Sequence, residues 1–207
     1  ILETINLLGI KEVSIDEYLS SQFDYPVFLN IDVMDYNERI DGLSADFNDF
    51  INHSADYKSS FMKYAKHTDI FIAGHYYGAG APYLFTRNDV RKSDFKICVV
   101  ADVSCDIDGP VATTIRPSKI DSPIYGYNPI TESEDDFLND DCIAVMAVDN
   151  LPCELPKDSS EDFGDNLINS IIPIISSNSN DIIKGATICK DGDLTEDFEY
   201  LRAYVSS

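Results

Sequence analysis

Two apolar runs, each followed at once by polar residues and turn formers, constrain the fold of this chain most. Residues 97–110 read ICVVADVSCDIDGP, in which a β-branched run gives way to Asp102, Ser104 and Asp106 before a Gly-Pro stop. Residues 142–148 (CIAVMAV) end in the same manner, in Asp149-Asn150-Leu151-Pro152. Such runs are typical of buried parallel strands. Ligands of open α/β sheets bind outside the carboxyl ends of the strands, so we expect a dinucleotide-type crevice here.

Shorter patterns along the chain alternate between strand and helix with short connections. Residues 25–33 and 69–74 have strand character, and 55–66 read as a helix with Tyr57, Phe61 and Tyr64 on one face. A further helix is predicted to begin with a cap at Asp158 and to bend or end at Pro173. The alternation predicts an α/β fold, a Rossmann-like mainly parallel sheet with flanking helices.

Composition excludes several classes of function. The 207 residues include 37 Asp and Glu against 15 Lys and Arg, a net charge of −22, which opposes binding to nucleic acid or to an anionic membrane surface. The densest apolar stretch, 167–175, is too short to cross a bilayer. The five cysteines form no C-x-x-C pair, which favours a reduced, cytoplasmic protein without a metal site.

The first sixteen residues predict a helix, a glycine stop and a strand. Ile1, Ile5 and Leu8 have helical spacing before Gly9, with no initiator Met and no N-cap, so we interpret the chain as a fragment. Residues 10–16 then read as a strand ending in Asp16. An acid at this point can bind the ribose hydroxyls of a dinucleotide. Alternatively, Asp16 caps a helix over 17–20, because no G-x-G-x-x-G loop is present.

Four stretches give the chain a family resemblance. They are VVADVSCD at 99–106, VDNLPCELP at 148–156, SEDFGD at 160–165 and IAGHYYGAGAPYLFTR at 72–87. Together they resemble the saccharopine dehydrogenases, and among these the lysine–2-oxoglutarate reductase half of the aminoadipic semialdehyde synthases. The resemblance covers most of the chain and is weakest over 24–52. It implies the alanine dehydrogenase and transhydrogenase type of fold, in which a C-terminal Rossmann-type domain binds the nicotinamide cofactor.

The resemblance implies two sets of site residues. The cofactor would be lined by Tyr76, Val103, Val148, Asp149, Asn150 and Leu151, together with Asp16 if its strand-end role holds. The substrate would lie beside Ser104, Cys105 and Asp106. The plainer interpretation of Asp149 is a turn acid before Leu151-Pro152, and the intact D-N-L-P motif favours the site.

The reaction implied is the interconversion of saccharopine with lysine and 2-oxoglutarate by hydride transfer to or from NAD or NADP. Asp16 favours NAD, because a carboxylate repels a 2′-phosphate. The catalytic Lys and His of the family belong to an N-terminal domain outside this chain, so we expect no catalytic acid–base residue here. The alternatives are an alanine dehydrogenase-like enzyme acting on another amino acid, and a non-catalytic binding or regulatory module.

The resemblance also implies that the glycine-rich loop and the first strand of the Rossmann sheet precede Ile1. That strand is central in the 3-2-1-4-5-6 order, so its absence would leave unpaired backbone groups. We expect the gap to be closed by a strand of the chain itself, by a second copy, or by the missing N-terminal segment. Residues from about 160 onward could return to the missing N-terminal domain.

Overall fold

The computed structural model describes residues 1–78, 80–175 and 181–206 of the chain. They form two compact units, Ile1–Asp149 and Asn150–Ser207. The division follows Asp149 directly, whereas the sequence indicates no boundary inside the chain. Whether the second unit returns to another domain stays a prediction.

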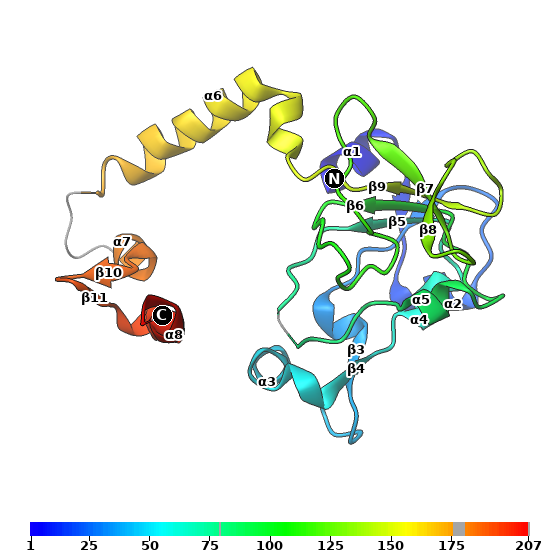
Figure 1. Cartoon of the computed structure of the whole chain (residues 1–207), viewed down its shortest axis with the longest axis horizontal. Coiled ribbons are helices and arrows are strands. Elements are labelled where there is room, and N and C mark those ends of the chain that lie inside the picture. Colours follow the sequence, from blue (N-terminus) through cyan, green and yellow to red (C-terminus); the bar gives the residue numbers. More distant parts are fainter. Residues whose placement is uncertain (79, 176–180, 207) are drawn as a thin grey trace. The chain divides into compact units, whose positions relative to one another are not determined.

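The first unit contains a five-stranded mixed sheet in the order β5-β6-β9-β7-β8 (Figure 1). Its strands are β5 (Ile70–Ala73), β6 (Val99–Asp102), β7 (Ile124–Asn128), β8 (Ser133–Asp135) and β9 (Ile143–Met146). The first three strands of that order are parallel, and β7 and β8 are added antiparallel. The predicted α/β, Rossmann-like class is confirmed, and the two apolar runs that led to it are the adjacent strands β6 and β9.

The core of the sheet forms where the two apolar runs pair as neighbouring strands. Val100 pairs with Phe71 on one side and with Val145 on the other, and both valines are fully buried. In the same core cluster, the rings of Phe61 and Phe71 meet edge to face at 4.9 Å, and Phe85 lies 5.7 Å from Phe61. Aromatic pairs at such distances add to the free energy of burial, so this cluster fixes β5 and β6 on the body of the unit.

The N-terminal segment is partly as predicted and partly different. Helix α1 (Leu2–Leu7) is stopped by Gly9, two residues further on, whose φ of +70° favours glycine. The expected strand over 10–16 is wrong beyond β1 (Lys11–Glu12), which pairs in parallel with β2 (Val27–Phe28). Ser14 instead starts helix α2 (Ile15–Ser20) through a capping box with Glu17. Asp16 is therefore an exposed residue of a first helical turn and not the end of a strand.

The segment between β2 and β5 also corrects the sequence analysis. The helix expected over 55–66 is replaced by a strand and a short helix, because Tyr57 pairs with Arg39 across an antiparallel ladder and its hydroxyl donates to Asp49 at 2.7 Å. Phe61 and Tyr64 are buried as expected. The elements here are η1 (Val33–Asp35), β3 (Asn37–Arg39), α3 (Phe47–Asn52), η2 (Ser54–Asp56), β4 (Tyr57–Ser59) and α4 (Met62–Ala65), and α5 (Arg87–Val90) follows β5.

The second unit is helical with one small hairpin, and none of its described residues is buried. Its elements are η3 (Leu151–Glu154), α6 (Pro156–Asn166), the π-helical η4 (Leu167–Ile171), α7 (Asp181–Ala186), β10 (Cys189–Lys190), β11 (Asp193–Leu194), η5 (Glu196–Leu201) and α8 (Arg202–Val205). Helix α6 begins at Pro156, before the predicted cap Asp158, because proline suits the first helical position. The helical run ends before Pro173, as predicted. In the described ranges, no helix is both long and apolar enough to cross a membrane.

Candidate functional site: the carboxyl ends of β6 and β9

Asp102, the last residue of β6, organises the loop that follows the strand. Its side chain is completely buried. One carboxylate oxygen accepts the Ser104 hydroxyl at 2.5 Å and the Cys105 backbone N–H at 3.0 Å, and the other accepts the Thr114 hydroxyl at 2.6 Å. A buried carboxylate is tolerated when donors of this kind replace its water. The buried carboxylate of Asp102 therefore fixes the start of the 103–108 loop.

The same loop contains an unusual backbone conformation. Cys105 has a φ of +51° and Asp108 a φ of +50°, in the left-handed region that costs free energy for residues other than glycine. Gly109 follows, and only glycine fits at this position, because a Cβ there would lie 2.7 Å from Cβ of Asp106. The loop therefore turns back tightly on itself, and the Asp108 N–H donates to the Thr114 carbonyl at 2.9 Å.

A thiol joins this loop to the end of the neighbouring strand. The Cys105 Sγ donates to the carbonyl of Ala147, just after β9, at 3.1 Å. Burial raises the pKa of that thiol, and the charges of Asp102, Asp149 and Asp106 raise it further. The thiol therefore remains protonated at neutral pH, which keeps its proton available for the hydrogen bond.

The end of β9 is held on its other side by Ser118. The Ser118 N–H donates to the Ala147 carbonyl at 2.8 Å, and its hydroxyl accepts the Ala147 N–H at 2.9 Å. Tyr125 of β7 fixes the segment before Ser118, since its hydroxyl donates to the Thr113 carbonyl at 3.0 Å. Val148 is then buried and Asp149 is exposed, with no hydrogen bond to its carboxylate from the part of the chain that the structure describes.

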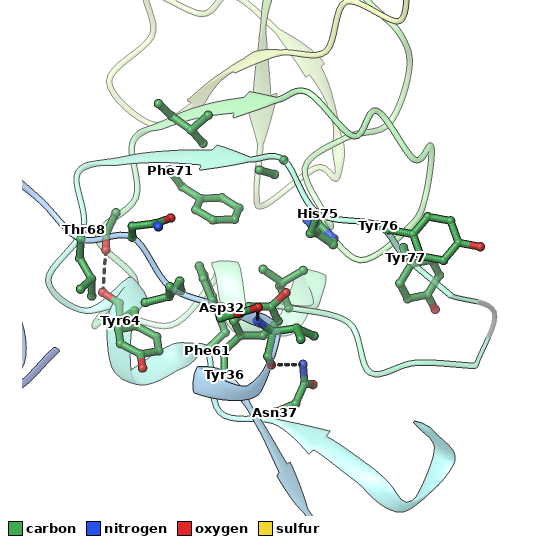
Figure 2. Close-up of a pocket in the computed structure, with 18 of the residues that line it drawn as sticks. Asp32, Tyr36, Asn37, Phe61, Tyr64, Thr68, Phe71, His75, Tyr76 and Tyr77 are labelled. Carbon is green, nitrogen blue, oxygen red and sulfur yellow. Dashed lines mark hydrogen bonds between the residues drawn. The ribbon is translucent and has the colours of Figure 1, made fainter. Parts of the chain in front are cut away.

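The carboxyl end of β5 opens into a cavity of about 720 Å³ (Figure 2). His75, Tyr76 and Tyr77 line its end; Tyr76 is 93% exposed. Burial lowers the pKa of His75, against the opposing charges of Asp102 and Asp106. Its Nε2 atom is buried with no hydrogen-bond partner among the described residues, which fits a neutral ring.

The cavity extends along the outer edge of β5. Its wall is formed by α1 residues, by the segment 27–33, and by Ile70, Phe71 and Ile72. The carbonyls of Asp69 and Ala73 accept from β6, so alternation along the strand turns the backbone groups of Ile70 and Ile72 towards the cavity. Ile70 is 61% exposed and Ile72 38%, and β6 is the single strand paired with β5 in the described ranges.

Most of the predicted site residues follow the ends of neighbouring strands of the sheet. Val103, Ser104, Cys105 and Asp106 follow β6, and Val148 and Asp149 follow β9, the strand beside it. Tyr76 lies at the end of β5, one strand further along. Asn150 and Leu151 belong to the second unit, where Leu151 begins η3. Asp16 lies in α2, and no described contact joins it to the strand ends.

Sequence reasoning missed the residues that hold the site. The sequence predicts Asp102 at the end of a strand but indicates no role for its side chain, and Thr114 and Ser118 lie in a proline- and threonine-rich stretch without a helical or strand pattern at these positions. Their pairing with Asp102 and Ala147 depends on contacts distant in the sequence. No group of three or more His, Cys, Asp or Glu residues in the described part of the chain is arranged to hold a metal ion.

A mainly parallel sheet with polar loops at the carboxyl ends of two adjacent strands is the arrangement at which open α/β sheets bind ligands, and nucleotide-binding dehydrogenase domains are built in this way. The family model described as "Alanine dehydrogenase/PNT, C-terminal domain" matches residues 28–197, and the chain belongs to that family. The match includes β5, β6 and β9 with their loops, and Asp16 lies outside it.

Individual relatives agree with the family match. The chain is 31% identical over 166 residues to an alpha-aminoadipic semialdehyde synthase of Arabidopsis thaliana, covering 76% of this chain and 16% of that protein. It is 26% identical over 164 residues to the mitochondrial alpha-aminoadipic semialdehyde synthase of Mus musculus, covering 67% and 18%. A saccharopine dehydrogenase [NAD(+), L-lysine-forming] of Schizosaccharomyces pombe is 31% identical over 112 residues, covering 52% and 28%. The chain thus spans less than a third of each of these relatives, and the predicted family resemblance is confirmed.

Proposed function

We propose that the chain is the cofactor-binding part of a saccharopine dehydrogenase-like oxidoreductase. The whole protein would interconvert saccharopine with lysine and 2-oxoglutarate by hydride transfer. The observation that supports this most is the hydrogen bond from Cys105 to Ala147, which brings the loop after β6 against the end of β9. The two loops that the resemblance assigns to substrate and cofactor thereby lie side by side.

The environments of several proposed binding residues support their roles. The nicotinamide cofactor supplies the hydride chemistry when bound, and the protein positions it. Val103 and Val148 present backbone at the strand ends, and the exposed carboxylate of Asp149 is free to accept hydrogen bonds from a ribose or a carboxamide. Asn150 and Leu151 follow directly in the chain. Tyr76 presents an exposed ring to the nucleotide.

The substrate side of the proposal rests on the 104–106 segment. Ser104, Cys105 and Asp106 are partly exposed and follow the buried end of β6. The Ser104 hydroxyl and Cys105 thiol already donate within the protein, so Asp106 is the residue with a free carboxylate for an amino-acid substrate. We propose that it faces the cationic nitrogen of the substrate, because opposite charges attract strongly in a partly buried site.

The choice between NAD and NADP rests on a residue whose position differs from expectation. Asp16 belongs to a helical turn, and its contact with a ribose stays a prediction that favours NAD. Location in the cytoplasm likewise stays a prediction.

Binding of the cofactor to the purified whole protein tests the proposal, because the resemblance places the glycine-rich loop of the site before Ile1. We expect calorimetric titration to show binding of NADH, with NADPH binding more weakly. The matched control is Asp16→Asn, which should reduce the difference between the two cofactors. If the whole protein binds neither cofactor at millimolar concentration, the chain is better explained as part of a non-catalytic module that has kept the fold.

The purified chain alone is expected to lack saccharopine dehydrogenase and reductase activity. Moving the substrate proton needs an acid–base pair, which we place in the N-terminal domain of the whole protein. The measurement is NADH absorbance at 340 nm with saccharopine, or with lysine and 2-oxoglutarate. Turnover by chain free of host enzymes would place the acid–base residues within these 207 residues instead.

A further inference from the structure

Among the residues that the structure describes, Asp102 is the single acidic or basic residue that is buried. Removing a carboxylate from water costs several kcal/mol unless donors replace the water. Here two hydroxyls and one backbone N–H do so, from Ser104, Thr114 and Cys105. All three donors come from segments after β6, so Asp102 binds the site loops and not the sheet.

We propose that Asp102 is a positioning residue, which sets the shape of the 103–106 loop and, through Cys105, its position against the end of β9. That this loop binds a substrate beside a cofactor rests on the proposed function. Asp102 itself touches neither ligand in this proposal, because its carboxylate is fully buried and its acceptor positions face the three donors.

The geometry shows how one carboxylate could control both strand ends. Its bond to the Cys105 N–H holds that residue in the left-handed conformation, which an unsupported cysteine disfavours. In that conformation the Cys105 thiol reaches the Ala147 carbonyl. The chain of contacts therefore runs from Thr114 through Asp102 and Cys105 to the strand that leads into Val148 and Asp149.

An amide of the same size cannot replace this carboxylate. Asparagine offers one acceptor oxygen and a donating NH₂ group, whereas all three partners of Asp102 donate. Asp102→Asn therefore keeps the volume of the side chain but replaces one of its two acceptor oxygens. The variant loses either the oxygen that accepts from Thr114 or the oxygen that accepts from Ser104 and Cys105. Thr114→Val is the milder variant, since it removes one of the three hydrogen bonds and keeps the shape.

The test follows the Cys105 thiol, whose reactivity needs no cofactor. Native chain and variants are treated with iodoacetamide, and modification of Cys105 is followed by peptide mass spectrometry. Asp149→Asn is the matched control, because Asp149 also raises the pKa of the thiol but makes no described hydrogen bond to the loop. We expect Asp102→Asn to speed modification about tenfold over that control, through local opening of the loop. Thr114→Val should give an intermediate rate.

Equal rates in Asp102→Asn and Asp149→Asn would overturn the proposal, because the carboxylate would then act through charge alone. Urea unfolding of each variant separates local opening from global loss of stability; a rate increase that global unfolding explains fully would also overturn it. NADH titration of the whole protein adds the ligand readout, and we expect at least tenfold weaker binding in Asp102→Asn. If the wild-type whole protein binds no NADH, the proposed function fails while the thiol measurement still decides the role of Asp102.

Discussion

The carboxyl ends of β6 and β9 lie next to each other in the sheet, and an aspartate marks each of them. Asp102 closes β6 with its side chain fully buried and three donors directed at it. Asp149, beyond the end of β9, is exposed and accepts no hydrogen bond within the described residues. Two similar sequence patterns therefore use an aspartate in different ways. Asp102 holds the loop, and the carboxylate of Asp149 is left available to a ligand.

The difference teaches that a strand-end acid is not by itself evidence of a binding residue. What distinguishes the two aspartates is the segment 111–118, which supplies Thr114 to the first and supplies Ser118 to the backbone beside the second. A carboxylate with its acceptor positions filled is structural, and one with them free can bind. The following predictions use this contrast.

Replacing Asp102 is expected to have the largest effect. Asp102→Leu leaves two hydroxyls and one N–H without an acceptor in a buried site, and we expect a loss of roughly 3 kcal/mol in the free energy of unfolding. Asp149→Leu should change it by less than about 0.5 kcal/mol, as is usual for exposed positions. Urea unfolding followed by circular dichroism measures both. Equal losses would mean that the two carboxylates have the same structural role.

The outer edge of β5 provides the next contrast, since β6 and β9 are paired on both sides and β5 on one in the described chain. Unpaired strand edges with apolar side chains promote association. We expect the purified chain to associate, and Ile72→Lys, which places a charge at that edge, to weaken association at least tenfold, or about 1.4 kcal/mol.

Light scattering over a concentration series measures this association, with Ile124→Lys as the control because Ile124 is similarly exposed but lies in a strand paired on both sides. A chain that stays monomeric, or a control that weakens association as much as Ile72→Lys, would contradict a role for the β5 edge.

Asp149→Ala is expected to weaken cofactor binding in the whole protein by about tenfold, the effect of losing one hydrogen bond to a charged group. The protein should remain folded, because the carboxylate has no partner to lose within the described chain. Calorimetric titration with NADH gives the affinity, and a circular dichroism melt confirms the fold. An unchanged affinity would make Asp149 a turn residue, the plainer of the two interpretations of the sequence.

His75, at the end of the third parallel strand, should give the smallest effect. Its pKa is lowered by burial, so below its ordinary pKa of 6.5 the unfolded chain binds a proton that the folded chain does not. Stability is therefore lost as pH falls from about 6.5 towards the lowered pKa. The free energy of unfolding should fall more between pH 7.5 and pH 5.5 for the wild type than for His75→Asn. Parallel losses would show that His75 ionises as freely as in the unfolded chain.

The sequence predicts the parts of this structure that are encoded locally. The β-branched runs that became β6 and β9 are recognisable without any partner, and Gly9 and Pro173 end their helices as predicted. The helix expected over 55–66 is wrong because pairing of Tyr57 with Arg39 overrides its helical spacing. The role of Asp102 could not be predicted, because Thr114 comes to it through the fold and no local spacing marks the pair.

The strand order has a consequence for how the domain folds. Val99 of β6 pairs with Ala144 of β9, and Met146 of β9 pairs with Ile124, so β9 enters between two strands synthesised before it. Until β9 is made, β6 has β5 alone as a neighbour and β7 has β8 alone. Pairing of β6 with β9 closes a long loop of intervening chain, and closing long loops slows folding. The growing chain therefore carries two half-sheets with open edges, and the last strand of the sheet to be synthesised is the one that unites them.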